Sequence, residues 1–245
     1  MRNIKLVLRY DGTRYSGWQS QEHEENTIQG KLTAILERMT GESIRLAGSG
    51  RTDAGVHALG QVANFRTESP LSCEKLYEEL NQYLPEDMAV LSVEEADPRF
   101  HSRLNAVRKT YLYRIWNSPV HNVFERKYVY PLEQALDVEA MRQAADRLTG
   151  IHDFRAFSSY RRTKKSTVRT LEEISIEREG EEIRLRFTGN GFLYHMVRIL
   201  TGTLIEVGLH KKKPEDMERI LASLDRQNAG FTAPAQGLFL VNVEY

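Results

Sequence analysis

The sequence predicts an α+β fold made of two ferredoxin-like halves, at residues 1–100 and 101–245. In the first half, strand-like alternation and helix-like spacing of apolar residues follow the order β-α-β-β-α-β. The same order recurs in the second half with one extra helix, after Asp97-Pro98. Antiparallel sheets of this kind leave one face free of helices. We therefore expect the two sheets to meet near residues 97–103, around a central cleft.

The first half opens with an alternating run at residues 4–10, which ends at Asp11-Gly12 as a strand ends in a turn. Thr27 offers an N-cap oxygen to a helix whose apolar residues recur at helical spacing up to the stop at Gly41. The rest of this half is predicted as two strands, a helix closed by Pro85 and a strand, at residues 43–48, 61–66, 74–84 and 88–95.

The second half begins with a β-rich run at residues 107–116, followed by a helix at 138–148 with Asp137 as its cap and Gly150 as its stop. The remaining elements are predicted as two strands, two helices and a closing strand, at residues 168–178, 182–188, 192–207, 214–224 and 238–244.

Composition excludes several classes of protein. The chain has 245 residues, of which 40% are hydrophobic and 28% are charged. This composition is ordinary for a globular protein and too apolar for wholesale disorder. No apolar run approaches the roughly 20 residues of a membrane helix, and the N-terminus lacks the apolar stretch of a secretory signal. The single cysteine, Cys73, excludes an internal disulfide and fits a reducing compartment. We expect a cytoplasmic protein without membrane association.

Familiar catalytic patterns are missing from the sequence. The seven histidines never show the spacing of a helical metal site, and neither a P-loop, a dinucleotide-binding glycine pattern nor a nucleophile elbow occurs. These gaps disfavour a metal centre, nucleotide hydrolysis and nicotinamide chemistry. His195 falls inside the predicted helix 192–207, where it is either a base or a structural residue.

Two features suggest a nucleic-acid substrate. The charges of 34 basic and 34 acidic residues cancel, which by itself argues mildly against binding to phosphates. Tyr111 and Tyr113 share one face of their strand, and they are either core residues or stacking rings on an open sheet of the kind that RNA-recognition domains use. A basic run without acids is either a solvated loop or a phosphate-binding patch; it comprises Arg161, Arg162, Lys164, Lys165 and Arg169.

The glycine-rich loop at residues 48–58 carries an anion, a cation, a hydroxyl and an imidazole between its glycines. Within it, Gly50-Arg51-Thr52-Asp53-Ala54-Gly55-Val56-His57-Ala58 resembles the catalytic motif of the TruA family of tRNA pseudouridine synthases. The resemblance extends over nearly the whole chain, through the blocks at residues 15–19, 100–103, 109–113, 150–154, 190–198 and 233–238.

The resemblance implies the pseudouridine synthase fold and a homodimer that works without cofactor or metal. It implies isomerisation of uridine to pseudouridine at positions 38, 39 and 40, in the anticodon stem-loop of tRNA. Such chemistry conserves atoms and redox state, and it requires a nucleophile, a group that moves a proton and a pocket for an unstacked base. Two alternatives stay open: a non-catalytic RNA-binding dimer, and a pseudouridine synthase with another RNA target.

By family position, Asp53 is the nucleophile, which attacks the sugar carbon or the ring, or triggers elimination. A pocket disfavours an ionised carboxylate and a guanidinium counters this, so Arg198 is expected as the partner of Asp53. Arg51 is then left to hold the loop or to contact the nucleotide.

The resemblance also assigns roles outside the loop. Tyr111 is expected to stack on the target uracil, with its hydroxyl moving the C5 proton. Tyr113 is expected to be a core residue, and Leu238 is either an apolar wall beside the base or a core leucine. We expect His57 to order the loop by hydrogen bonding. The basic run, together with Lys211-Lys212-Lys213, is expected to bind the tRNA backbone.

Overall fold

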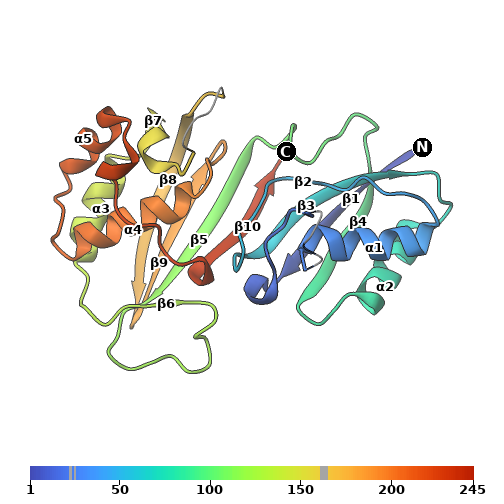
Figure 1. The fold of residues 1–245 in the computed structure, drawn as a ribbon, viewed down its shortest axis with the longest axis horizontal. Helices are drawn as coiled ribbons and strands as arrows, with labels where there is room; N and C mark the ends of the chain where they lie inside the picture. Colours follow the sequence, from blue (N-terminus) through green and yellow to red (C-terminus); the bar gives the residue numbers. More distant parts are fainter. Residues whose placement is uncertain (22–23, 25, 161–164) are drawn as a thin grey trace. The chain divides into compact units, whose positions relative to one another are not determined.

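The computed structural model describes residues 1–21, 24, 26–160 and 165–245, and its contacts divide the chain into two compact units. Unit 1 comprises Met1–Val107 and Phe239–Tyr245, and unit 2 comprises Arg108–Leu238. Figure 1 shows mostly antiparallel sheet with helices packed on it, so the predicted α+β class is confirmed. The division of the chain at residue 100 and the central cleft stay predictions.

The sheet of unit 1 is built around its first strand. Strand β1 (Arg2–Tyr10) pairs antiparallel with β3 (His57–Thr67) on one side and with β4 (Met88–Ala96) on the other. The other edge of β3 receives the short β2 (Ala47–Gly48), which is antiparallel, and β10 (Leu238–Glu244), which is parallel. The last strand of the chain therefore joins the sheet that the first strand begins.

Two helices cover one face of this sheet. Helix α1 (Ile28–Thr40) begins at Thr27, whose hydroxyl accepts the amide of Gly30 at 3.1 Å, and ends at Gly41 in the left-handed conformation. Helix α2 (Cys73–Tyr83) packs on α1 and β4 (Figure 1). Their buried leucines lie at helical spacing against the apolar side of β1. Both predicted helices and the Thr27 and Gly41 caps are confirmed.

Unit 2 repeats the use of an antiparallel sheet covered by helices. Strand β5 (Arg108–Trp116) pairs with β9 (Glu182–Gly189), which pairs with β8 (Val168–Glu179), and β8 pairs with β7 (Gly150–Asp153). Helices α3 (Val138–Asp146) and α4 (Met196–Gly208) pack side by side on it. The other elements are β6 (Tyr130–Pro131), α5 (Asp216–Ser223) and the 3₁₀ turns Gly12–Arg14 of unit 1, Phe154–Phe157, Arg226–Asn228 and Ala235–Gly237.

Three predicted boundaries are wrong. Of the strand predicted at 43–48, only the two residues of β2 are in a strand. Ile44 and Leu46 are buried in alternation, but the Ile44 amide donates to the Glu37 carboxylate at 3.1 Å. The predicted strand at 61–66 begins four residues earlier as β3, so His57 lies on a strand. The helix predicted from residue 192 begins at Met196, because the backbone makes a turn there and His195 has a φ of 62°.

The described part of the chain contains no helix of the length and apolar character needed to cross a membrane.

A buried ion cluster joins β5 to β9 in unit 2. Glu182 Oε1 accepts hydrogen bonds from Arg114 Nε at 2.7 Å and from Arg184 Nε at 2.8 Å, and Glu182 is only 8% exposed. The hydrogen bond from Arg114 is the main cause that lowers the Glu182 pKa from 4.5 to about 2. Because the folded state holds this carboxylate ionised more strongly than the unfolded chain does, its contribution is full above about pH 4.5 and is lost as the pH falls toward about 2.

We expect Glu182→Gln to lower the free energy of unfolding at pH 7 by about 1–3 kcal/mol, because the charged hydrogen bonds from Arg114 and Arg184 weaken. The variant should also lose less stability than the wild type between pH 5 and pH 3, as measured by urea unfolding. The control is Glu94→Gln, which removes an exposed pair with Lys5 and should cost under about 1 kcal/mol. An identical pH dependence in wild type and Glu182→Gln would contradict this assignment.

Candidate active site

The loop at residues 49–56 connects β2 to β3 and carries Asp53. Three backbone hydrogen bonds hold it: Ser49 donates to the Val62 carbonyl at 2.7 Å, Trp18 donates to Thr52 at 3.0 Å, and Gly55 donates to Tyr15 at 3.3 Å. The segment that follows β1 is therefore the support of the loop. Asp53 itself is partly exposed, and its carbonyl accepts the Val56 amide at 3.1 Å, which closes a turn around it.

Two glycines let this support approach the loop closely. Gly17 has a φ of +98°, and a β-carbon there would lie 2.7 Å from the Thr52 carbonyl oxygen and 3.1 Å from the Asp53 carbonyl carbon. A β-carbon at Gly12 would lie 2.0 Å from the Val56 carbonyl oxygen. Only a residue without a side chain fits at either position. The contact fixes the backbone on both sides of Asp53.

A buried polar network lies beneath the loop. Tyr10 and Thr52 share a hydrogen bond between their hydroxyls at 2.8 Å, and Gln61 Nε2 donates to the Gly50 carbonyl at 3.1 Å. Ser49 Oγ donates to Gln61 Oε1 at 2.6 Å. Burial raises the pKa of Tyr10 to about 12, so its hydroxyl stays protonated and neutral. Sequence reasoning missed this network, because nothing near Tyr10 or Gln61 in the sequence indicates that they meet.

His57 supports the same region from the start of β3. Its Nδ1 accepts the Gly12 amide at 3.0 Å, and its ring stacks on Phe239 with 4.7 Å between centroids. This bond reaches Gly12, outside the glycine-rich loop, so the expectation that His57 orders that loop stays a prediction. Arg51 lies on the loop, is exposed, and donates from Nε to Gln19 Oε1 at 3.0 Å.

The other sequence-predicted residues belong to unit 2. Tyr111 lies on β5 opposite Phe187 of β9 and is 8% exposed. Its ring meets Phe192 edge-on, with 5.0 Å between centroids. Tyr113 is fully buried, which confirms its assignment to the core, and its hydroxyl donates to the Pro234 carbonyl at 2.8 Å.

Arg198 and Leu238 are connected through one segment of unit 2. On α4, Arg198 Nε donates to the Ala233 carbonyl at 2.7 Å, and the Ala233 amide donates to the Arg198 carbonyl at 3.0 Å. Together with Tyr113, which holds Pro234, these bonds fix the chain that leads through a 3₁₀ turn to Leu238. Leu238 is 5% exposed. The structure thus brings Arg198, Tyr113 and the approach to Leu238 together within unit 2.

His195 is not inside a helix, contrary to the sequence prediction. It is the residue before α4, in the left-handed conformation, and its Nδ1 lies 2.9 Å from Ser159 Oγ. Its ring stacks on Tyr194 with 3.7 Å between centroids. A turn, and not helical periodicity, sets the direction of this imidazole.

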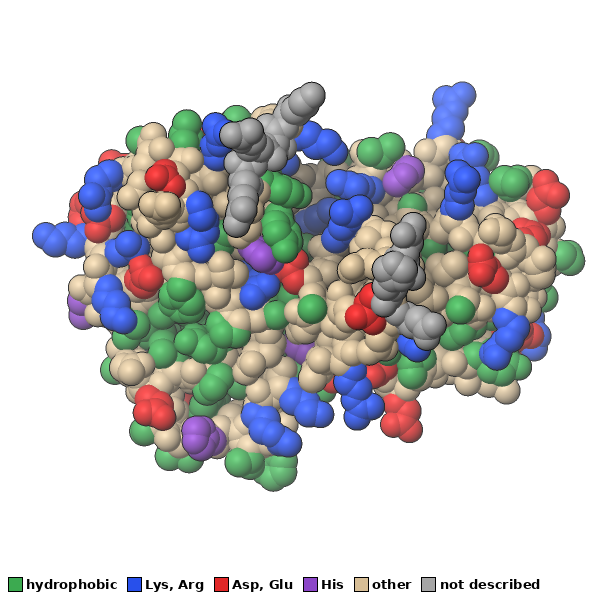
Figure 2. Space-filling model, viewed as in Figure 1, with side chains coloured by type: hydrophobic (Ala, Val, Ile, Leu, Met, Phe, Trp, Pro, Cys, Tyr) green, Lys and Arg blue, Asp and Glu red, His purple; other side chains and the backbone are tan. Residues whose placement is uncertain are grey.

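The expected phosphate-binding residues are only partly described. Arg161, Arg162 and Lys164 lie outside the described residues, whereas Lys165 is exposed and Lys212 pairs with Glu206 at 3.4 Å. Figure 2 shows Lys and Arg side chains spread over the visible face with acidic side chains among them, in keeping with the zero net charge. Among residues 1–21, 24, 26–160 and 165–245, no group of three His, Cys, Asp or Glu side chains is arranged to hold a metal ion.

With this geometry in place, comparison with known proteins decides the family. The protein-family model described as tRNA pseudouridine synthase matches residues 6–105 and 144–245 of the chain. The chain belongs to the tRNA pseudouridine synthase family. It is therefore an isomerase that acts on tRNA uridine, and its α+β fold is that of a pseudouridine synthase.

Full-length relatives of this tRNA pseudouridine synthase occur among curated bacterial proteins. The chain is 49% identical over 245 residues to tRNA pseudouridine synthase A of Bacillus sp. strain KSM-64, covering 100% of both chains. It is 46% identical to tRNA pseudouridine synthase A 2 of Clostridium tetani, covering 100% of this chain and 99% of the relative. It is 47% identical to tRNA pseudouridine synthase A of Brevibacillus brevis over the full length of both.

Proposed function

We propose that this enzyme converts uridine to pseudouridine at positions 38, 39 and 40 of the tRNA anticodon stem-loop, with Asp53 as the nucleophile. The observation that carries the assignment is the loop at residues 49–56. Its backbone is held against Gly12 and Gly17, while the Asp53 side chain stays partly exposed. A rigid backbone with an accessible carboxylate suits a nucleophile that must meet an extruded base.

The reaction conserves all atoms. Asp53 attacks the target nucleotide, the bond between C1′ and N1 breaks, the uracil turns, and a bond forms between C1′ and C5. The bond between Asp53 and the nucleotide breaks in turn, which restores the free carboxylate. The proton on C5 is then lost, and N1 of the detached base carries a proton in the product. Arg198 is proposed as the guanidinium partner of Asp53. Arg51 holds the loop or contacts the nucleotide, in keeping with its bond to Gln19. The reaction draws on no cofactor.

Tyr111 is proposed to stack on the target uracil, with Leu238 as an apolar wall. The support for this role is the edge contact with Phe192, which orients the Tyr111 ring on β5. The hydroxyl is proposed to move the C5 proton.

We expect Tyr111→Phe to bind tRNA with nearly the wild-type Kd and to slow turnover by about 100-fold, because the ring face remains and the proton carrier is lost. Tritium release from C5-labelled uridine measures turnover, and filter binding measures the Kd. The matched control is Tyr113→Phe, which removes a hydroxyl from the core of the same strand. It should lower the Tm while turnover stays within a few fold of wild type. Unchanged turnover in Tyr111→Phe would remove the role of the hydroxyl.

The partner of the enzyme is proposed to be the anticodon stem-loop, bound by a cytoplasmic homodimer. Phosphate contacts are assigned to Arg161, Arg162, Lys164 and Lys165, of which Lys165 is described and exposed. Cations of this kind position RNA without reading its sequence.

The proposed function is tested by tritium release from tRNA transcripts that contain C5-labelled uridine, followed by mapping of the modified positions. Release at positions 38, 39 and 40 is expected. Release only from ribosomal or small nuclear RNA would favour a different RNA target. Binding of tRNA without any release would favour a non-catalytic RNA-binding dimer.

A further inference from the structure

An exposed row of aromatic rings lies at the start of α4, among residues to which the proposed chemistry assigns no role. Tyr194 stacks on His195 with 3.7 Å between ring centroids and 29° between ring planes. Tyr160 packs on Tyr194 with 5.6 Å between centroids. Tyr160 is 51% exposed and Tyr194 is 45% exposed. We call Tyr160, Tyr194 and His195 the aromatic platform.

The aromatic platform is held in place by the backbone around it. Ser159 donates its amide to the Tyr194 carbonyl at 3.2 Å, and its hydroxyl lies 2.9 Å from His195 Nδ1. His195 has a φ of 62°, a left-handed conformation that is strained for a residue with a side chain. Such strain persists only where the surrounding structure holds it. The platform is therefore a preformed surface, which a ligand can use at little cost in entropy.

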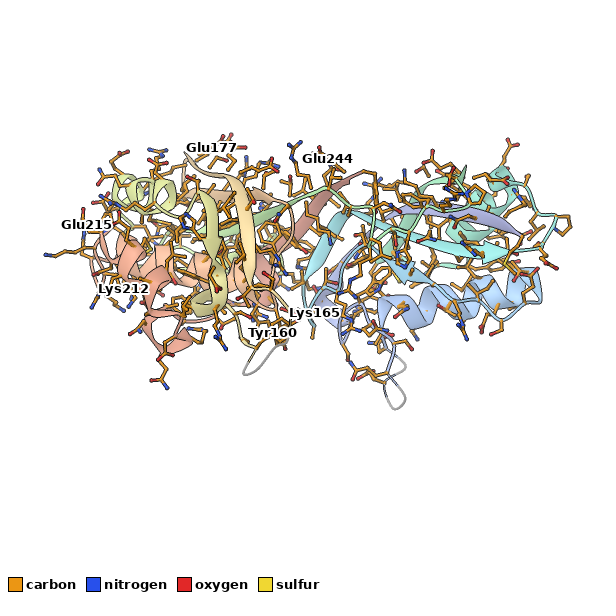
Figure 3. All side chains as sticks on the ribbon, turned by 90° about the horizontal axis from the view of Figure 1, so that it is seen from above. Tyr160, Lys165, Glu177, Lys212, Glu215 and Glu244 are labelled. Carbon is orange, nitrogen blue, oxygen red and sulfur yellow. The ribbon has the colours of Figure 1, made fainter. Side chains whose placement is uncertain are left out.

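Cationic side chains lie beside the aromatic platform. Figure 3 shows Lys165 and Tyr160 close together where β8 begins, with Glu177 toward the opposite end of that strand. A β-carbon at Gly191 would lie 3.7 Å from Arg169 Nε, so this guanidinium lies against the segment that leads to Tyr194. Exposed rings flanked by Lys and Arg are the combination that binds single-stranded nucleic acid, because rings stack on bases and cations meet phosphates.

The platform is also connected to the ring proposed to stack on the target base. Phe192 meets Tyr111, and Tyr194 follows Phe192 by two residues. Two residues of extended chain span at most about 7 Å. The backbone of Tyr194 therefore lies within about 7 Å of that of Phe192, whose ring meets Tyr111.

We propose that the aromatic platform binds an unpaired base of the RNA, next to the target uridine, by stacking it on Tyr194 and Tyr160. The proposal rests on the proposed function, because it takes RNA as the substrate and Tyr111 as the ring at the target. Stacking tolerates any base, since every base has a π-face. The platform therefore adds affinity for an opened loop and does not select its sequence.

The binding test uses stem-loop RNAs with 2-aminopurine on either side of the target uridine. We expect the wild type to quench the fluorescence of one of them. The Kd should rise about 5- to 100-fold in Tyr160→Ala/Tyr194→Ala, as loss of base stacking implies. Tyr194→Phe should keep the quenching, whereas Tyr194→Leu, which keeps apolar bulk without a ring, should lose it. The matched control is Tyr77→Ala, which removes a tyrosine that is 43% exposed on α2 and should leave the Kd unchanged.

Kinetics and thermal unfolding separate the outcomes. Loss of stacking should raise the KM for tRNA in the double variant, with the Tm near that of wild type. If the wild type releases tritium and the double variant keeps the wild-type Kd and quenching, the base-stacking role of the platform is wrong and the proposed function is unaffected. If the wild type releases no tritium but its quenching depends on Tyr194, the proposed function is wrong and the base-stacking role of the platform is unaffected.

Discussion

Asp53→Asn is expected to lower the rate of tritium release by at least about 10³-fold, while the Kd for tRNA changes little. The amide keeps the shape of the side chain and loses the charge and the nucleophilic oxygen, so the loss falls on the chemical step. Asp53 is partly exposed, and the backbone bonds that hold its loop do not involve its carboxylate. The Tm of the variant checks that it is folded, so that a lower rate can be assigned to the chemical step.

Asp53→Ala should behave like Asp53→Asn, because either change removes the reacting carboxylate. The control is Asp146→Asn, which neutralises an exposed aspartate at the end of α3 and should keep full activity. Full activity in both Asp53 variants would end the assignment of this residue as nucleophile. Lost activity with lost tRNA binding would instead assign Asp53 to substrate binding.

Gly17→Ala is expected to have the second largest effect, on stability and activity together. The new β-carbon meets the Thr52 carbonyl oxygen at 2.7 Å, and the residue must keep a φ of +98°. Left-handed strain and overpacking together should lower the free energy of unfolding by about 2–5 kcal/mol. If the loop moves to relieve the contact, Asp53 moves with it, and a displacement of about 1 Å can lower the rate about 100-fold.

Gly41→Ala provides the matched control for Gly17→Ala. Gly41 also has a left-handed φ, of +72°, but a β-carbon there meets nothing within 4 Å. Gly41→Ala should lower the free energy of unfolding by about 1–2 kcal/mol and leave the turnover of the folded enzyme unchanged. Urea unfolding and tritium release at saturating tRNA measure the two effects. Equal behaviour of the two variants would show that the close approach of Gly17 to the loop does not position Asp53.

Local patterns predicted most elements because the forces that form them act between neighbours in sequence. Helix α1 is an example: the Thr27 cap, the spacing of its leucines and the Gly41 stop all lie within fifteen residues. The strand predicted at residues 43–48 is wrong for a physical reason. Alternating burial at Ile44 and Leu46 is real, but a distant partner strand decides whether a backbone forms a sheet, and here the side chain of Glu37 takes the Ile44 amide.

The candidate site divides in the same way. The loop around Asp53 was predicted because its residue types lie together in one segment and resemble a family motif. The aromatic platform was not predicted, because Tyr160 and Tyr194 are far apart in the sequence and their contact depends on a left-handed residue at His195. Helical periodicity at residues 192–207 had placed His195 inside a helix instead.

The α+β class, most of the helices and strands, the family and the segment that carries Asp53 follow from local sequence, since each is encoded in short runs of residues. Only in the folded chain do Gly12 and Gly17 hold this segment from behind, Tyr10 and Gln61 lie beneath it, and Tyr160 pack on the exposed Tyr194. The physical reason is that these contacts join residues distant along the chain, and only the packing of the folded chain brings them together.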